Sequence, residues 1–127
     1  ALTLANTIID GNCRLANAGT LTSLGGNIES PGNTCALNLG SDQNGVSTQA
    51  LGLRARQESS TTPFHPLTRT SVARGAGVPA VCSALPLDQL FRSRASSCSA
   101  GSIDGGYVLK DGFDIGTSLG ADTDLAP

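Results

Sequence analysis

The sequence contains few of the residues that build bulky cores. Of its 127 residues 3% are aromatic, and neither tryptophan nor methionine occurs. A core must therefore come from Leu, Ile, Val and Ala. Apolar residues still reach 39%, which is too high for a disordered tail. Because a chain of this length fits one domain, we expect residues 1–127 to form a single one.

Charge and long apolar runs are also sparse, and this argues against two classes of partner. The net charge is -2, and the arginines of the second half have no aromatic residues interleaved with them, so a nucleic-acid partner is not expected. No apolar run approaches the roughly 18 residues of a membrane span. No signal-peptide pattern opens the chain. We expect a soluble, already processed chain without a transmembrane segment.

Zinc-ligand spacing is missing as well. The four cysteines include no CxxC pair, and none has a histidine at ligand spacing. The cysteines therefore predict two disulfides and an oxidising compartment. Three pairings are possible, and we favour Cys13 with Cys35 and Cys82 with Cys98 because each pair joins neighbours in the chain.

A repeated pattern is the main feature that the sequence does contain. The stretches LANTIIDGNC (residues 4–13) and LGGNIESPGNTC (residues 24–35) share the order Leu, Asn, aliphatic, turn residues and Cys. Ile8 and Ile28 are 20 positions apart, and the two cysteines are 22 apart. A period of about 20 residues is typical of solenoids, in which each unit stacks on its neighbour.

We therefore predict an all-β fold, a right-handed parallel β-helix of about two to four coils. The coils occupy residues 1–45, with strands at 2–9, 20–24, 27–29 and 35–39. Asn6 and Asn27 are expected to stack as an amide ladder. A loop-rich capping region spans residues 46–116, and a tail spans residues 117–127. Within the cap we expect a loop at residues 54–66, a short helix after Pro86 and a hairpin around residues 104–112.

NTIIDGNC, followed by GTLTSLGGNIESPGNTCAL, resembles the C-terminal coils of bacterial secreted parallel β-helix proteins of the pectin-lyase-like superfamily, in particular surface proteins of the choice-of-anchor and CSLREA type. TTPFHPL, TSVARGAG, DQLFRSR and DIG follow in the order usual for that family. The chain departs from the family at Arg74, at Leu90 and Phe91, and at Phe113, where a cysteine is usual. Cys98 is then the substitute for that cysteine. The resemblance implies a fold more firmly than an activity.

The polar residues predict structure more readily than catalysis. Asp10 precedes Gly11 and is most simply a turn residue. His65, between two prolines, is interpreted as bonding a loop backbone. No carboxylate pair or carboxylate and base falls at repeat-related positions, so we expect no enzyme activity and no cofactor. A Ca²⁺ site among the acidic residues from Asp104 to Asp124 stays open.

Two functions remain for comparison. The first is a non-catalytic secreted, cell-surface or periplasmic module that belongs to a larger surface or membrane-associated assembly. The alternative is a carbohydrate-binding or carbohydrate-active β-helix. Expected contacts with protein subunits are the apolar first strand and a polar, arginine-bearing surface, although a solvated face is the favoured interpretation of the arginines. These residues are Leu2, Leu4, Ile8, Arg54, Arg56, Arg69 and Arg74. The identity of the partner, glycan binding and whether the chain is a processed fragment stay open.

Overall fold

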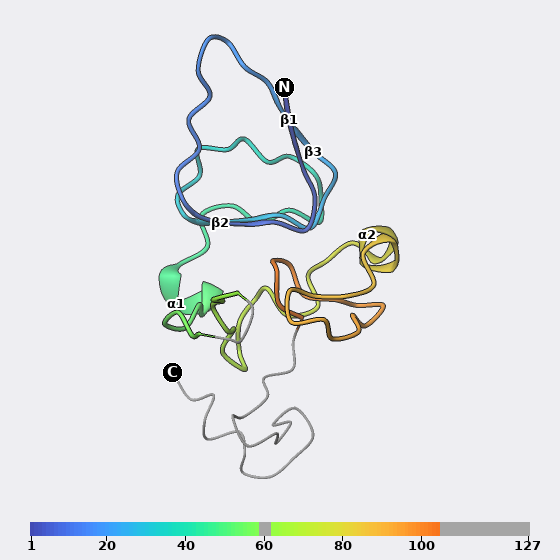
Figure 1. The fold of residues 1–127 in the computed structure, drawn as a ribbon. Helices are drawn as coiled ribbons and strands as arrows, with labels where there is room; N and C mark the ends of the chain where they lie inside the picture. The colour runs from blue at the N-terminus through green and yellow to red at the C-terminus, as the bar shows by residue number, and fades with distance from the viewer. Residues whose placement is uncertain (59–61, 105–127) are drawn as a thin grey trace.

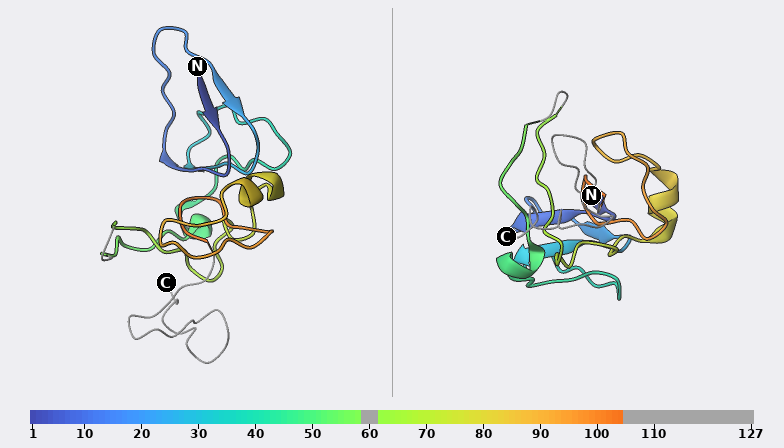
Figure 2. Two further views of the ribbon diagram at one scale, coloured as in Figure 1. Left: turned by 45° about the vertical axis from the view of Figure 1, so that its right-hand side comes forward. Right: turned by 90° about the horizontal axis from the view of Figure 1, so that it is seen from below.

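The computed structural model describes residues 1–58 and 62–104, and its two parts lie end to end (Figure 1). The first part, residues 1–46, contains β1 (Leu2–Leu4), β2 (Ile8–Gly11), β3 (Leu21–Ser23) and β4 (Ile28–Pro31). The second part, residues 47–104, contains the helices α1 (Thr48–Leu51) and α2 (Pro79–Ala84) joined by loops. The left view in Figure 2 shows the same separation of a stranded part and a loop-rich part.

The strands pair in parallel across the sequence repeat. β1 lies beside β3 with Leu2 opposite Leu21, and β2 lies beside β4 with Ile8 opposite Ile28. The expected alignment of Ile8 with Ile28 is thus confirmed. A third pass of the chain adds only one parallel bridge, between Ile28 and Gln43.

The predicted β-helix is wrong. The described residues hold four short strands in two separate two-stranded parallel sheets, and these do not continue into a coiled sheet. The expected strand at residues 2–9 breaks at Asn6, whose φ of 48° is left-handed, and residues 35–39 form no strand because Ala36 has a φ of 53°. Such backbone cannot continue a parallel ladder.

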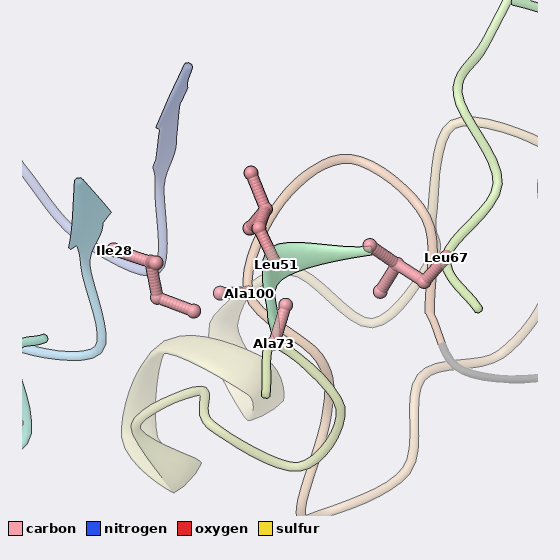
Figure 3. Packing of buried hydrophobic residues seen from close by; sticks show 5 residues of the cluster. All are labelled: Ile28, Leu51, Leu67, Ala73 and Ala100. Carbon is pink, nitrogen blue, oxygen red and sulfur yellow. The ribbon is translucent and has the colours of Figure 1, made fainter. Parts of the chain in front are cut away.

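The position of the aliphatic side chains explains why no solenoid core forms. Successive strand residues point to opposite faces. Ile28 faces the second part and packs with Leu51 and Leu67, in a cluster completed by Ala73 and Ala100 (Figure 3). Its neighbour Glu29, fully buried, accepts hydrogen bonds from Thr34 and Cys35. A charged carboxylate thus occupies the face that a β-helix would fill with aliphatic residues.

The expected amide ladder is also absent, because the two asparagines bond to other groups. The Asn6 side chain bonds to Val78, whose backbone N–H donates to Asn6 Oδ1 at 2.7 Å. The Asn27 side chain accepts from the Thr7 N–H and donates to Leu4 O. Asn6 therefore ties the first part to the second, whereas Asn27 ties neighbouring passes of the first part together.

The helices lie where turn chemistry permits them. Ser47 caps α1 by accepting from the Ala50 N–H, and Gly52 ends it with a left-handed φ of 62°. α2 begins at Pro79, a residue favoured in the first helical turn. The helix expected after Pro86 is wrong, since residues 85–94 form turns. There the Asp88 carboxylate accepts backbone N–H groups of Leu90 and Arg92, which a helix would need for its own bonds.

The loop expected at residues 54–66 extends from the second part as two antiparallel arms, residues 53–58 and 62–67. Bridges join Leu53 to Leu67 and Gln57 to Phe64. The hairpin expected around residues 104–112 and the tail at 117–127 lie outside the described residues, apart from Asp104.

Candidate binding cleft

A cleft of about 490 Å³ lies beside β2, between that strand, the two hairpin arms and residues 100–103. We call it the β2 cleft. Ile8, Leu53, Leu67 and Ile103 contribute its apolar lining. Asp10, Phe64, His65 and Gln89 contribute polar or aromatic groups. Concave sites with an apolar lining and a few polar groups are the usual form of ligand sites in proteins.

Backbone hydrogen bonds hold the hairpin arms over the β2 cleft. Gln57 and Phe64 exchange two of them, at 2.7 and 2.9 Å, and the Arg54 N–H donates to Pro66 O at 2.8 Å. His65 Nδ1 lies 2.8 Å from Arg54 O. The interpretation of His65 as a residue that bonds a loop backbone therefore agrees with its geometry.

The opposite wall is held by close backbone contact. The Gly101 N–H donates to Asn6 O at 2.7 Å, and Gly101 has a φ of 91°. A Cβ atom at this position would lie 2.8 Å from Ile8 Cδ1. Glycine is required here because it alone combines this conformation with this approach.

The polar side chains of the β2 cleft present hydrogen-bond acceptors. A carbonyl oxygen only accepts, so His65 Nδ1 carries the proton that binds Arg54 O, and in the neutral imidazole Nε2 is then an acceptor. Gln89 Nε2 donates to Pro63 O at 2.8 Å, which leaves Gln89 Oε1 as an acceptor. The exposed Asp10 carboxylate accepts only, and no described residue donates to it. The cleft thus favours a ligand that donates hydrogen bonds.

The carboxylates of the first part, by contrast, bind their own backbone. Glu29 accepts from the Thr34 N–H and hydroxyl, both at 2.6 Å, and from the Cys35 N–H at 2.9 Å. Burial acts to raise the pKa of Glu29, but these hydrogen bonds outweigh it, and the pKa is lowered. Glu29 is therefore a charged structural group.

Asp42 has the same role at the neighbouring turn. It accepts from the Ser23 hydroxyl at 2.6 Å and from the backbone N–H groups of Asn27 and Leu39. Desolvation acts to raise the pKa of Asp42, yet the hydrogen bonds, that of Ser23 foremost, lower it overall. Neither Glu29 nor Asp42 lines the β2 cleft.

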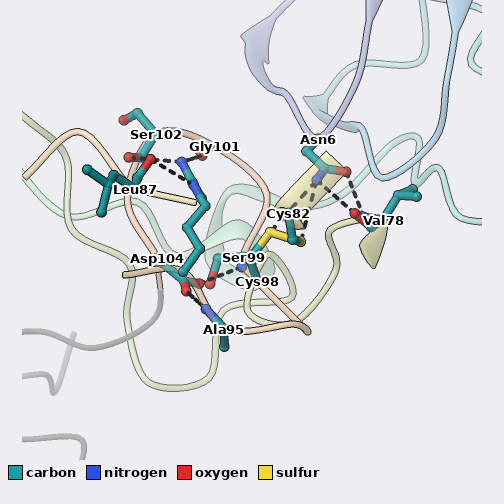
Figure 4. Close-up of a disulfide and its surroundings, with 11 residues drawn as sticks. Asn6, Val78, Cys82, Leu87, Ala95, Cys98, Ser99, Gly101, Ser102 and Asp104 are labelled. Carbon is teal, nitrogen blue, oxygen red and sulfur yellow. Dashed lines mark hydrogen bonds between the residues drawn. A yellow bond between two sulfur atoms is a disulfide. The ribbon is translucent and has the colours of Figure 1, made fainter. Parts of the chain in front are cut away.

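In the second part, Asp88 and Asp104 organise the loops around a disulfide. Asp88 pairs with Arg92 at 3.2 Å and also accepts the Asp104 N–H. Asp104 in turn accepts from the N–H groups of Ala95 and Ser99 (Figure 4). These two carboxylates therefore hold neighbouring turns together through hydrogen bonds with their backbone N–H groups.

The cysteines form the two pairs that the sequence favours. Cys13 is joined to Cys35 with a Cα–Cα distance of 4.9 Å, and Cys82 to Cys98 with 5.8 Å (Figure 4). The first bond links two passes of the stranded part. The second fastens α2 to the loop that ends at residue 104. Asn6 Nδ2 lies 3.8 Å from both sulfurs of the second bond.

The apolar residues expected to contact a partner do not form one exposed patch. Leu2 is 45% exposed, Leu4 is half-buried, and Ile8 packs against the core cluster. Of these three, Ile8 alone lines the β2 cleft.

The expected arginine surface is also divided. Arg54 lies in a hairpin arm, and Arg56 forms an exposed ion pair with Glu58 at 2.8 Å. Arg69 is exposed, whereas Arg74 is half-buried and its Nε donates to Thr68 O at 2.8 Å. Burial lowers the pKa of Arg74, Arg69 lowers it further, and Asp104 acts in the opposite direction. Arg74 thus has a structural contact with Thr68 and is not part of an exposed arginine surface.

Within residues 1–58 and 62–104, no helix has the length and apolar character needed to cross a membrane. The same residues contain no group of three or more His, Cys, Asp or Glu side chains arranged to hold a metal ion. The Ca²⁺ site considered between Asp104 and Asp124 lies outside the described residues except for Asp104.

Comparisons with protein-family models, with curated proteins and with solved structures found no match to this chain. The resemblance to secreted surface proteins therefore stays a prediction. The β-helix fold that it implied is not the fold of the described residues. The convergence of Asp10, Phe64, His65 and Gln89 was missed by sequence reasoning. Their spacing follows no motif, because the hairpin arms and the turn at Gln89 bring them together.

Proposed function

We propose that the chain is a non-catalytic structural or interaction module of a protein outside the cytoplasm, at the cell surface or in the periplasm, within a larger assembly. The observation that carries this proposal is the use of three carboxylates, of which Glu29 and Asp88 are buried and Asp42 is half-buried. Glu29, Asp42 and Asp88 each accept several hydrogen bonds from the protein's own backbone. Because their oxygens bind the protein's own backbone, these carboxylates are unsuited to acid–base chemistry on a substrate.

The β2 cleft also lacks the groups of a hydrolase site. Glycoside hydrolysis needs two carboxylates on either side of the scissile bond. Among the described residues that line this cleft, Asp10 is the one carboxylate. His65 supplies a second polar group, but its Nδ1 is committed to Arg54 O. This arrangement supports binding over turnover.

The extracytoplasmic location is supported by the disulfides. Cys13 is bonded to Cys35 just beyond the paired strands β2 and β4, and Cys82 in α2 is bonded to Cys98 in the following loop. Bonds of this kind persist in oxidising compartments and are rare in the cytosol. The two bonds therefore support a location in an oxidising compartment.

Carbohydrate binding is the second candidate, and the position of Phe64 favours it. An aromatic ring in a cleft with polar neighbours can pack against the apolar face of a sugar. Sugars need donors as well as acceptors, however, and the donors of His65 Nδ1 and Gln89 Nε2 are already used by the protein. We therefore propose carbohydrate binding only as the second candidate.

Purification of the protein from its native source under mild conditions tests the proposed role as an interaction module. We expect the chain to co-purify with protein subunits that mass spectrometry identifies, and we expect no glycan turnover by the isolated chain. A lone monomer in the native extract would contradict the interaction role. Turnover of an oligosaccharide that Asp10→Asn abolishes and Glu58→Gln retains would contradict the non-catalytic role.

A further inference from the structure

We propose that the β2 cleft binds a lysine or arginine side chain presented by a partner protein. This inference rests on the proposed function as an interaction module and names the chemistry of the contact. The ammonium or guanidinium group is held at Asp10 and at the acceptors of His65 and Gln89, and the aliphatic stem lies along the apolar lining.

The charge of the cleft selects a cation. Asp10 is the one formally charged side chain among the described residues that line the cleft. It is exposed and receives no hydrogen bond from a described residue, unlike Glu29 and Asp42. A carboxylate in a cleft with apolar walls attracts a positive group more strongly than one in open water, because the walls lower the local dielectric.

The hydrogen-bond groups select a donor. His65 Nε2 and Gln89 Oε1 remain acceptors because Nδ1 of the histidine and Nε2 of the glutamine are bound to Arg54 O and Pro63 O. Thr7 follows the same rule, since its hydroxyl donates to Ala5 O at 2.9 Å. Ammonium and guanidinium groups are donors without acceptors, so they match this set.

The apolar lining selects a group that sits at the end of a hydrocarbon stem. Ile8, Leu53 and Leu67 line the cleft, and each also packs in or against the core cluster. Lys and Arg side chains bury their methylene stems along such surfaces while the charged end stays polar. Phe64 adds a ring in the same cleft, and a ring face attracts a cation.

Titration of the oxidised full chain with capped tripeptides tests this assignment. The probes are acetyl-Ala-Lys-Ala-amide, its arginine analogue, its norleucine analogue and the free diamine cadaverine. Binding of each probe is measured from the amide chemical shifts of the protein in NMR spectra. We expect the lysine and arginine peptides to bind, with shifts at Asp10 and His65, and the norleucine peptide to bind at least tenfold more weakly. Affinity should also fall as salt is added.

Matched variants separate the cleft from general charge effects. Asp10→Asn changes the charge of an exposed side chain and leaves its shape nearly the same. It should lower the affinity for the lysine peptide about tenfold, since it removes one charge-assisted hydrogen bond. Glu58→Gln removes the same charge outside the cleft and should leave the affinity unchanged. Asp10→Glu should restore most of the binding. An unchanged amide spectrum elsewhere verifies that each variant is folded.

Several outcomes would overturn the assignment. These are equal binding of the norleucine peptide, an Asp10→Asn affinity equal to that of the parent, or binding of a neutral oligosaccharide in place of the cations. Cadaverine binding more tightly than either peptide would overturn a protein-borne source. If native partners co-purify while the peptides do not bind, the cation site fails and the interaction role stands. If the peptides bind while no partner is found, the interaction role fails.

Discussion

The two parts of the molecule hold their shape by different means. Residues 1–46 use parallel strand pairs, and the carboxylates of Glu29 (buried) and Asp42 (half-buried) accept hydrogen bonds in the turns between them. Residues 47–104 contain no strand ladder in their described portion beyond isolated bridges, and they depend on side-chain to backbone bonds around Cys82 and Cys98. The difference shows that a chain with few large apolar residues can be stabilised by side-chain hydrogen bonds and disulfides in place of a large hydrophobic core.

The two parts nevertheless share one apolar cluster. Ile28 comes from the first part, and Leu51, Leu67, Ala73 and Ala100 come from the second. Asn6 adds polar contacts across the same junction, to Val78 and Gly101. Separate stability of each part is therefore not expected, and the comparison can be tested at this junction.

Ile28→Ala should have the largest effect, because it removes a fully buried side chain from the shared cluster. We expect a loss of about 3–4 kcal/mol in the free energy of unfolding. Urea unfolding followed by two probes, one in each part, should show one shared transition. Ile28→Val, which keeps most of the volume, should cost about 1 kcal/mol. Two separate transitions in the parent chain would show that the parts are independent.

The double variant Cys82→Ser and Cys98→Ser should have the next largest effect. This bond closes a sequence separation of 16, and the chain-entropy model assigns about 3 kcal/mol to such a loop. Hydrogen exchange should show lost protection in the second part first, at Gly77 and Ala100. The matched variant Cys13→Ser and Cys35→Ser should instead expose the turn around Glu29. Equal loss across both parts in each variant would contradict the local roles.

Glu29→Gln should destabilise the first part by about 2 kcal/mol, because a buried carboxylate with charged hydrogen bonds is replaced by an amide that cannot accept all of them. The measurement is urea unfolding at neutral pH. Arg56→Gln, at an exposed ion pair, is the control and should change stability by less than about 0.5 kcal/mol.

The lowered pKa values of Glu29 and Asp42 give that effect a pH dependence. A carboxyl whose pKa is lower in the folded state stabilises the fold above its ordinary value, 4.5 for Glu29 and 3.8 for Asp42. This stabilisation is lost as the pH falls below those values and through the folded pKa values. The free energy of the shared unfolding transition should therefore fall as the pH is lowered through this range. In Glu29→Gln the slope of stability against pH should be shallower in this range.

Ser47→Ala should have the smallest effect among the sites with a structural role, about 1 kcal/mol. It removes the hydroxyl that accepts from the Ala50 N–H at the start of α1, the helix that carries Leu51 into the shared cluster. Thermal unfolding measures the change, and Ser47→Asp, which can cap the same N–H, should restore stability. An unchanged melting temperature in Ser47→Ala would show that α1 is held by packing alone.

Several features followed from the sequence because they depend on local or covalent chemistry. The repeat spacing placed Ile8 opposite Ile28, since parallel strands align equivalent positions. The cysteine spacing favoured the observed pairs. Spacing and conformational preference are properties of short segments, so they can be recognised without the fold.

Tertiary structure decided which face of each strand is apolar and where the cleft lies. The repeat was interpreted as a solenoid whose isoleucines point inward, but Ile28 packs outward against Leu51, and Glu29 is buried on the opposite face. The alternation of residues is the same in both arrangements, so only the partner segment distinguishes them. Asp10, His65 and Gln89 likewise meet in one cleft because distant segments fold over β2. No sequence spacing encodes that convergence, since it depends on contacts between residues that are far apart in the chain.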